Sequence, residues 1–338
     1  MLIARGVRAA DEAALTELIL SVSGHMTTMP RSPKEARHRI DHALSSLDKT
    51  ITEPGDEAYL FVLEENGAIV GLSAIYASVG LDRPFYNYRV ARIAKASPDL
   101  DIRVDAQVLH LVNDYVGAAE LGTLYLSPDA RGGGRGRLIS FTRLMFLAAF
   151  RERFPDRVMA EIRGWTDEEG NSPFWDAVGR QFFKLDLTTA DQRSGRDYRF
   201  IAELMPSYPI YADLLPDSAR DVVAVPHDGA AGALRLLESQ GFSYENLVDI
   251  FDAGPCIEAR QKNIGIVRDA RRYMVQKSDS IQTGEQKCLI SNLDLEQFVT
   301  VQGAVSLSGE MISLSDELRI ALNVGEGEPV LVYPMERK

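Results

Sequence analysis

Apolar and polar positions over the first 190 residues predict an ordered mixture of strands and helices. Short apolar runs rich in β-branched and aromatic residues predict strands at residues 2–7, 58–63, 68–77, 86–93, 106–112, 121–126, 158–162 and 181–187. Helical spacing predicts helices at residues 11–21, 32–47 and 135–151, and another that opens at Ser172. Asn66-Gly67 between two of the strands is a strong hairpin signal. This order predicts an α+β fold with a mixed sheet and one parallel strand–helix–strand crossover.

The second half of the chain predicts two further units. A helix over residues 232–240 ends at Gly241, and a strand follows over residues 246–251. The polar stretch 276–286 is a candidate boundary. Beyond it the pattern predicts a short helix capped near Ser313 or Ser315, and short strands at residues 288–291, 298–307 and 330–333. We therefore expect an α+β domain over residues 1–190, a second α/β segment over 191–275 and a small β-rich module over 276–338.

Composition and charge exclude several classes of protein. The 338 residues are 45% hydrophobic and 25% charged, which is typical of a globular chain. There are 49 acidic and 37 basic residues, and the net charge of −12 argues against a nucleic-acid partner. Arg5 and Arg8 interrupt the start before a signal-peptide core forms, and the longest apolar run, residues 144–150, is far short of the ~20 residues of a membrane helix. Cys256 and Cys288 fit neither a disulfide framework nor a zinc spacing. We expect a cytoplasmic protein without a membrane partner.

The segment with the clearest chemistry joins the strand at residues 121–126 to the helix at residues 135–151. Its glycines let the main chain approach a bound group without an intervening Cβ, and they are Gly132, Gly133, Gly134 and Gly136. From residue 131 to residue 151 there are five arginines and no acidic residue. Backbone amides at a helix start, with arginines beside them, favour an anion such as a pyrophosphate.

Other interpretations explain fewer features of this loop. If the loop has no function, it is a tight turn with solvated arginines. A nucleotide P-loop needs a Gly-Lys-Ser/Thr sequence that is missing, and a Rossmann loop needs an acidic residue about 20 positions further on, after a second parallel strand. What remains is the pattern Arg131-x-x-Gly134-x-Gly136. It resembles the coenzyme A pyrophosphate loop of the GNAT acyltransferases, in whose fold the preceding strand offers free backbone groups to the pantetheine arm.

Five motifs are spread along the whole chain: Met26-Thr27-Thr28-Met29-Pro30, Pro84-Phe85-Tyr86-Asn87-Tyr88-Arg89, Ser172-Pro173-Phe174-Trp175, Ala202-Glu203-Leu204-Met205-Pro206 and Asp249-Ile250-Phe251-Asp252-Ala253-Gly254-Pro255. Together they resemble the motifs of the arginine N-succinyltransferase family. The resemblance implies transfer of the succinyl group of succinyl-CoA to the α-amine of L-arginine, giving N2-succinylarginine and CoA as the first step of arginine degradation to glutamate and succinate. It implies a GNAT-like acyl-CoA-binding domain over residues 1–190, with succinyl-CoA as co-substrate and no permanently bound cofactor. Some members are paired α and β chains, one form of which accepts ornithine. The intact glycine loop favours a catalytic chain.

The resemblance also implies roles for single residues. His227 corresponds to the proton donor, and an imidazole with a pKa near 6.5 suits the protonation of a thiolate. Leu124 corresponds to a succinyl-CoA contact, made through its backbone or by apolar packing, and a plain core leucine is compatible with both. The candidates for pyrophosphate contacts are Arg131, Gly134 and Gly136, followed by Gly133 and Arg135.

Recognition of the amino-acid substrate is less specific in sequence. A guanidinium pairs with planar carboxylates, and the acids near strand ends are Glu120, Glu161, Asp249 and Asp252. Each is also explained as an ordinary surface or capping acid. Arg89 and Arg163 are candidates for the substrate carboxylates, with solvated arginines as the alternative.

Two further groups are not assigned to the chemistry. His38 and His42 lie four apart on a helix, but no third metal ligand is evident, so we interpret them as a solvated face and predict no metal site. Cys256 has apolar neighbours, and we do not predict that it is a nucleophile.

Two other functions stay open from the sequence. One is a GNAT acyltransferase that acts on ornithine or another amine. The other is a non-catalytic acyl-CoA-binding subunit of a heteromeric succinyltransferase. In each case the partners are small molecules, and the assembly is either a homo-oligomer or a pair with a homologous subunit.

Overall fold

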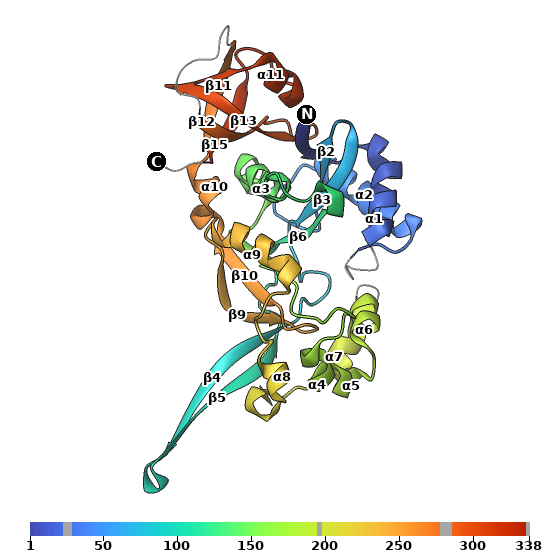
Figure 1. The fold of residues 1–338 in the computed structure, drawn as a ribbon, viewed down its shortest axis with the longest axis vertical. Coiled ribbons are helices and arrows are strands. Elements are labelled where there is room, and N and C mark those ends of the chain that lie inside the picture. Colours follow the sequence, from blue (N-terminus) through green and yellow to red (C-terminus); the bar gives the residue numbers. More distant parts are fainter. Residues whose placement is uncertain (23–28, 195–197, 278–285, 336–338) are drawn as a thin grey trace.

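A single mixed sheet organises the computed structural model, which describes residues 1–22, 29–194, 198–277 and 286–335 (Figure 1). Its strands are β1 (Leu2–Gly6), β2 (Ala58–Glu65), β3 (Ala68–Tyr76), β4 (Asn87–Ser97), β5 (Ile102–Val112), β6 (Ala119–Leu126), β7 (Arg157–Glu161), β8 (Ile210–Tyr211), β9 (Ser243–Asp249), β10 (Pro255–Arg260), β11 (Arg271–Lys277), β12 (Gln286–Ser291), β13 (Val299–Ser308), β14 (Met311–Leu314) and β15 (Pro329–Pro334). Their order across the sheet is β12-β15-β11-β14-β13-β1-β2-β3-β6-β7-β10-β9-β4-β5-β8.

Strand direction in this sheet confirms the predicted crossover. Neighbouring strands are antiparallel except for β6 with β7 and β11 with β14. The chain passes from β6 through one long helix to β7, as the pattern predicts. The fold class, α+β with a mixed sheet, is confirmed.

Helices pack on both faces of the sheet. They are α1 (Glu12–Val22), α2 (Pro33–Asp48), α3 (Arg135–Ala149), α4 (Pro173–Ala177), α5 (Gly179–Phe183), α6 (Leu187–Ser194), α7 (Arg199–Leu204), α8 (Asp217–Arg220), α9 (Ala231–Glu238), α10 (Gly265–Asp269) and α11 (Asp316–Leu322). The expected cap of α2 is present, because the Ser32 side chain accepts a hydrogen bond from the Glu35 amide at 3.2 Å. Ser172 and Ser315 cap α4 and α11 in the same way.

The side chains of β2 show why the N-terminal half needs helices on both faces. Tyr59 and Phe61 pack into the core with α3, whereas Leu60 and Val62 pack into a second core with α1 and α2. A strand buried on both faces is apolar along its whole length instead of alternating. Within the α3 core, Phe146 lies at the centre of an aromatic group and contacts Tyr59, Phe61 and Phe298, with ring centroids 4.8, 5.1 and 5.0 Å away.

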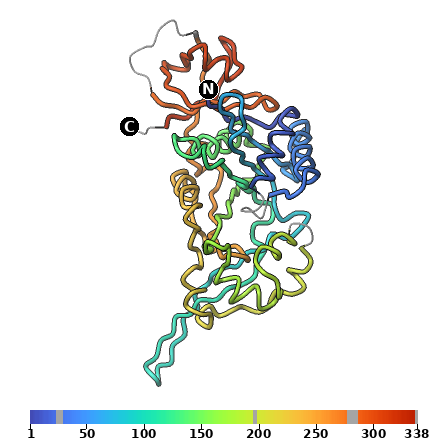
Figure 2. The backbone as a smooth tube through the Cα atoms, turned by 45° about the vertical axis from the view of Figure 1, so that its right-hand side comes forward, coloured from blue at the N-terminus to red at the C-terminus, as the bar shows by residue number. Residues whose placement is uncertain are grey.

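The middle of the chain forms a long hairpin and a helical layer. Strands β4 and β5 extend from the sheet as an arm, with the short helices α4 to α8 beside its base (Figure 1, Figure 2). The strand predicted at residues 181–187 is wrong, since residues 181–183 end α5, residues 184–186 connect the helices and Leu187 starts α6. Phe183 stacks on Trp175 at 5.5 Å, and Gly179 allows this approach because a Cβ there would lie 2.1 Å from the Trp175 ring. Tertiary packing therefore selects a helix where the short apolar run alone favours a strand.

The C-terminal strands β11 to β15 and helix α11 form the upper part of the molecule in Figure 1. The candidate boundary at residues 276–286 lies mostly outside the described residues, which stop at 277 and resume at 286. The sheet continues through β1 and β13, and Phe298 belongs to the α3 core. The division into 1–190, 191–275 and 276–338 stays a prediction. Among the described helices, none is both long and apolar enough to span a bilayer.

Phe146→Ala tests the packing of the α3 core. The substitution should lower the free energy of unfolding by about 3–5 kcal/mol, because it empties a packed site. The control Phe182→Ala truncates a phenylalanine side chain that is 38% exposed. It should lower the free energy of unfolding by about 0.5 kcal/mol or less. Urea unfolding measures both values. Equal losses for the two variants would contradict the central position of Phe146.

Candidate active site

The glycine-rich loop after β6 has a backbone that glycine adopts at little cost. Gly132, Gly133 and Gly134 have φ values of +95°, +59° and +82°. Helix α3 starts at the next residue, and the first amides of a helix have no intrahelical partner. No backbone carbonyl of the described residues accepts from the amides of Gly136 and Arg137. The loop therefore presents main-chain donors at a helix N-terminus, an arrangement that suits an anion.

The arginines around the loop differ in what they contact. Arg131 and Arg137 are exposed and form no ion pair with any described residue. The Arg135 side chain instead donates to Glu65 on β2, with Nε 3.1 Å from Oε2. A Cβ at Gly133 would lie 2.6 Å from Nη1 of Arg135. Arg135 thus fastens the loop to β2, and the charge for an incoming anion is left to Arg131 and Arg137.

Strands β6 and β7 stop pairing before this loop, and we call the unpaired stretch between them the slot. They pair only at Ala119–Val158 and Glu120–Met159, and beyond these residues the parallel ladder stops. On the other side of β6, the ladder with β3 has an irregularity that omits Thr123 and Leu124. The backbone of Leu124 is therefore outside both ladders in the described structure. Its side chain is half-buried against the α3 core, so the contact and the core interpretations of Leu124 are compatible.

Side chains from three elements hold the irregular stretch of β6. Thr123 has a φ of +48°, an uncommon value for a β-branched residue. Its hydroxyl accepts from Arg39 of α2 and lies 3.2 Å from the Tyr76 hydroxyl, while Arg143 of α3 donates to the Gly122 carbonyl at 3.2 Å. Burial lowers the pKa of Arg39 and of Arg143 to about 10, so both stay charged at pH 7. These two cations, Arg143 buried and Arg39 half-buried, fix the edge of the slot.

His227 lies beside the segment that follows β7, and its amide donates to the Arg163 carbonyl at 2.8 Å. Its Nδ1 accepts from the Gly229 amide at 3.0 Å. Because an amide can only donate, the neutral ring carries its proton on Nε2. Burial lowers the pKa of His227, and the charge of Arg163 lowers it further. The ring is therefore neutral at pH 7 and presents an Nε2–H donor.

The four acids considered for a guanidinium lie in one cluster. Glu161 ends β7, opposite Cys256 of β10, and Asp249 ends β9, opposite Asn87 of β4. Asp252 lies near both in the turn between β9 and β10, and Glu120 approaches Glu161 from β6. All four are half-buried.

Hydrogen bonds explain part of this cluster. Both carboxylate oxygens of Asp252 accept from amides, one from Gly164 and one from Gly254, each at 2.8 Å. Oδ1 of Asp249 accepts from the amides of Phe251 and Asp252 at 2.7 and 2.9 Å. Capping of turn amides therefore explains the hydrogen bonds of Asp249 and Asp252. It does not explain why the two carboxyl groups lie so close together, and it does not apply to Glu161.

Burial raises the pKa of all four carboxyl groups. For Glu161 the pKa is raised well above its ordinary value, first by burial and then by repulsion from Asp249 and Glu120. For Asp249 burial is again the main cause, followed by repulsion from Asp252. Burial raises the pKa of Glu120 to about 7, although the charges of Arg39 and Arg143 oppose the rise. A cation placed among these groups would relieve the repulsion.

The remaining candidates lie in different places. Arg163 is exposed, donates to Thr166 Oγ1 at 2.8 Å and lies near His227, whereas Arg89 pairs with Asp114 away from the loop. His42 has Nε2 3.7 Å from Asp56, and His38 is exposed on α2. In the described residues no group of three or more His, Cys, Asp or Glu is placed to hold a metal. Cys256 is fully buried, and burial raises the pKa of its thiol well above the ordinary value.

Three residues of this region were not among the sequence candidates. Arg39 and Arg143 lie in ordinary amphipathic or apolar helix sequence, and no local pattern marks them. Asn87 does lie in a motif that we used for the family resemblance, but its neighbours on the sheet come from β9 and β10, far along the chain. Only the tertiary structure brings these residues together.

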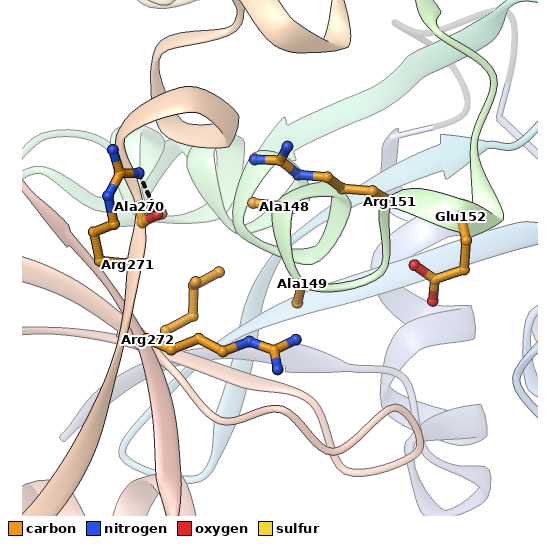
Figure 3. A pocket seen from close by; sticks show the side chains of 8 residues that line it. Ala148, Ala149, Arg151, Glu152, Ala270, Arg271 and Arg272 are labelled. Carbon is orange, nitrogen blue, oxygen red and sulfur yellow. Dashed lines mark hydrogen bonds between the residues drawn. The ribbon is translucent and has the colours of Figure 1, made fainter. Parts of the chain in front are cut away.

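A second hollow lies elsewhere, between the C-terminal end of α3 and the start of β11 (Figure 3). Arg151, Arg271 and Arg272 line it. Arg151 donates to the Val267 carbonyl, and Arg271 donates to the carbonyls of Arg268 and Ala270. Two of its three cations are thus engaged with the main chain, and the hollow does not include the glycine loop or His227.

Comparison with known proteins agrees with this geometry. The family model described as arginine N-succinyltransferase beta subunit matches residues 2–266. The chain belongs to the arginine N-succinyltransferase family. The arginine N-succinyltransferase of Yersinia pestis (strain Pestoides F) is 39% identical to it, over 99% of this chain and 98% of that protein. The protein of the same name from Escherichia coli (strain 55989 / EAEC) is 38% identical, over 98% and 96%.

A solved structure extends the family match to the whole fold. The arginine/ornithine succinyltransferase subunit AI from Pseudomonas aeruginosa superposes with a TM-score of 0.89 at 34% identity, over 100% of this chain and 99% of that one. The mixed sheet, the helical layer and the C-terminal strands therefore all belong to the fold of the arginine N-succinyltransferase family. As a member, this chain is an acyltransferase, and the expected family resemblance is confirmed.

Glu161→Gln tests the repulsion within the acid cluster. A carboxyl whose pKa is higher in the folded than in the unfolded protein lowers stability as pH rises above its unfolded value of about 4.3. In the ligand-free protein, Glu161→Gln should therefore raise Tm by about 2 °C at pH 8 and have little effect near pH 4.5. Thermal unfolding from pH 4.5 to pH 8 measures the trend. The exposed control Glu203→Gln should show no pH-dependent gain, and a lower Tm for Glu161→Gln at pH 8 would contradict the account.

Proposed function

We propose that this chain transfers the succinyl group of succinyl-CoA to the α-amine of L-arginine, giving N2-succinylarginine and CoA, the first step of arginine degradation to glutamate and succinate. The observation that carries the proposal is the glycine loop with its unused amides, directly after a strand whose own edge is unpaired. Succinyl-CoA binds as a co-substrate and leaves as CoA, so no cofactor stays bound. We propose that the reaction takes place in the cytoplasm, with a homo-oligomer or a pair with a homologous subunit as the assembly.

The proposed CoA site follows the loop and the strand. The diphosphate lies at the amides of Gly134 and Gly136, with Arg131 supplying charge, because helix-start amides and guanidinium groups are good phosphate donors. The pantetheine arm then follows the free edge of β6, where the backbone of Leu124 is available to pair with its amides. This places the thioester in the slot toward β7.

The chemistry decides which nitrogen of arginine reacts. A guanidinium has a pKa above 12 and stays protonated, so it offers no lone pair to a thioester. The α-amine has a pKa far below that of the guanidinium, so a fraction of it is neutral at physiological pH. It is therefore the acceptor, and the guanidinium is left for recognition.

His227 acts on the departing sulfur in the proposed reaction. Attack of the neutral amine on the thioester carbonyl gives a tetrahedral adduct, and collapse breaks the carbon–sulfur bond. Nε2–H of His227 donates a hydrogen bond to the departing sulfur, and the proton lost by the amine nitrogen goes to that sulfur, so CoA leaves as the thiol. The ring thus begins and ends neutral, in agreement with a pKa that burial lowers.

The Pseudomonas aeruginosa relative carries both arginine and ornithine in its name, so ornithine is the second candidate acceptor. A non-catalytic acyl-CoA-binding subunit would need the open loop but not a histidine held in one tautomer. Thiol release from succinyl-CoA with each amino acid separates arginine from ornithine. Release with ornithine alone would replace the main proposal.

Gly134→Ala tests the loop. A φ of +82° strains alanine by about 1–3 kcal/mol, and relief of that strain moves the amides, so KM for succinyl-CoA should rise about 10-fold or more. Gly309→Ala is the matched control, with a φ of +59° and open space in the turn between β13 and β14. It should leave this KM unchanged. Equal kinetic effects in the two variants would show that the loop has no special part in binding.

His227→Ala separates an enzyme from a binding subunit. We expect kcat to fall about 10²–10⁴-fold, the usual range for loss of a general acid or base, while CoA still raises Tm as in the wild type. His38→Ala, at an exposed position on α2, should keep full activity. Unchanged turnover of His227→Ala would rule out the proton-donor role.

A further inference from the structure

We propose that Glu161, Asp249 and the amide oxygen of Asn87 form the pocket for the guanidinium of the acceptor amino acid. This inference rests on the proposed function and adds to it the residues that select the substrate. It concerns the ends of β7, β9 and the start of β4, on the β7 side of the slot.

The acids of the cluster are not equivalent in their surroundings. Glu120 lies near the cations Arg39 and Arg143, and Asp252 lies near Arg163 and accepts from two amides. Glu161 and Asp249 form no ion pair with a described residue, and their nearest charges are negative. The cluster thus contains two half-buried carboxyl groups with no cation of the described protein beside them, and a cationic ligand could reach them and supply that charge.

Asn87 gives a second, independent indication. Its side chain is fully buried, and Nδ2 donates to Glu161 Oε1 at 2.9 Å and to Cys256 Sγ at 3.4 Å. Its Oδ1 has no hydrogen-bond partner among the described residues. A buried carbonyl oxygen without a donor is destabilising. Asn87 Oδ1 is one of several such atoms in the described structure, and it is the one beside the acids, where an N–H group of a ligand would satisfy it.

The open acceptors match a guanidinium. Glu161 Oε2 and Asn87 Oδ1 receive no N–H donor from the described residues, and the Asp249 carboxyl adds an oxygen that its turn amides do not use, although its side chain also contacts the Asp252 carboxyl. A guanidinium offers five N–H donors and no acceptor, and its planar fork fits carboxylates. The primary ammonium of ornithine offers three donors from one point, on a shorter side chain. The pocket should therefore favour arginine over ornithine, and a neutral side chain of the same length should bind poorly.

The sheet holds these groups in place. Glu161 is fixed by Asn87 and by the β7–β10 ladder, and Asp249 is fixed by the two amides of its own turn. Glycine is required here, because a Cβ at Gly254 would lie 2.0 Å from the Ile162 carbonyl and one at Gly164 would lie 2.3 Å from the Asp252 carbonyl. A rigid arrangement of this kind discriminates by shape as well as by charge.

Glu161→Gln and Asp249→Asn test the pocket, with L-arginine and L-citrulline as probes. Citrulline replaces the guanidinium by a neutral urea of nearly the same shape. In each variant, KM for arginine should rise about 100-fold and the preference for arginine over citrulline should largely disappear. The change in kcat should be less than about threefold, and KM for succinyl-CoA should not change. Glu245→Gln, exposed on β9, is the matched control and should behave as the wild type.

A binding measurement keeps this test separate from the proposed function. Calorimetric titration of L-arginine and L-citrulline into the CoA-saturated protein needs no turnover. Binding of arginine by the wild type, with loss of that binding in Glu161→Gln and Asp249→Asn, would support the pocket. Equal arginine affinity in wild type and both variants, or equal affinity for the two amino acids, would overturn it. If the pocket fails while succinyl-CoA and arginine still release thiol, only this inference falls. Absence of thiol release with intact arginine binding would instead overturn the proposed function alone.

Discussion

The early separation of β6 from β7 is the constraint on which the rest of the site depends. Two residue pairs join these parallel strands, and then the ladder ends although both strands continue. Backbone groups on an internal strand edge need hydrogen-bond partners, so an open edge in the middle of a sheet is stable only beside water or a ligand. Arg39 and Arg143 hold the irregular part of β6 in this state from the two faces. The separation creates the slot, directs the glycine loop to one end of it and leaves the end of β7 at the other.

Charge is distributed along this slot in a way that matches two different substrates. The loop end has exposed arginines and unused amides, while the β7 end has half-buried carboxyl groups, within a chain of net charge −12. An acyl-CoA brings a diphosphate to the first end, and arginine brings a guanidinium to the second. Their reacting groups then meet between the ends, close to the segment that carries His227. Opposite charges at the two ends thus orient each substrate before any chemistry takes place.

Local sequence was sufficient for many elements of the first half and for one end of the site, but it predicted none of the strands β8, β10 and β11. The hairpin at Asn66-Gly67, the Ser32 cap and the strand–loop–helix around the three glycines depend on nearest neighbours, and the structure has them. Local sequence failed at residues 181–187, where stacking on Trp175 decides the conformation. It also did not identify Asn87, Arg39 or Arg143, because their importance comes from partners on distant elements. The acids were recognised as candidates, but their burial and mutual repulsion arise only when β9, β10 and β7 come together.

Amide hydrogen exchange with and without CoA tests the central claim most directly, since that claim concerns main-chain donors. The account predicts that CoA slows exchange at residues 132–137 and along residues 122–126 of β6, with no change in the turn at Gly309. Slower exchange confined to the hollow lined by Arg271 and Arg272, with residues 132–137 unchanged, would contradict it.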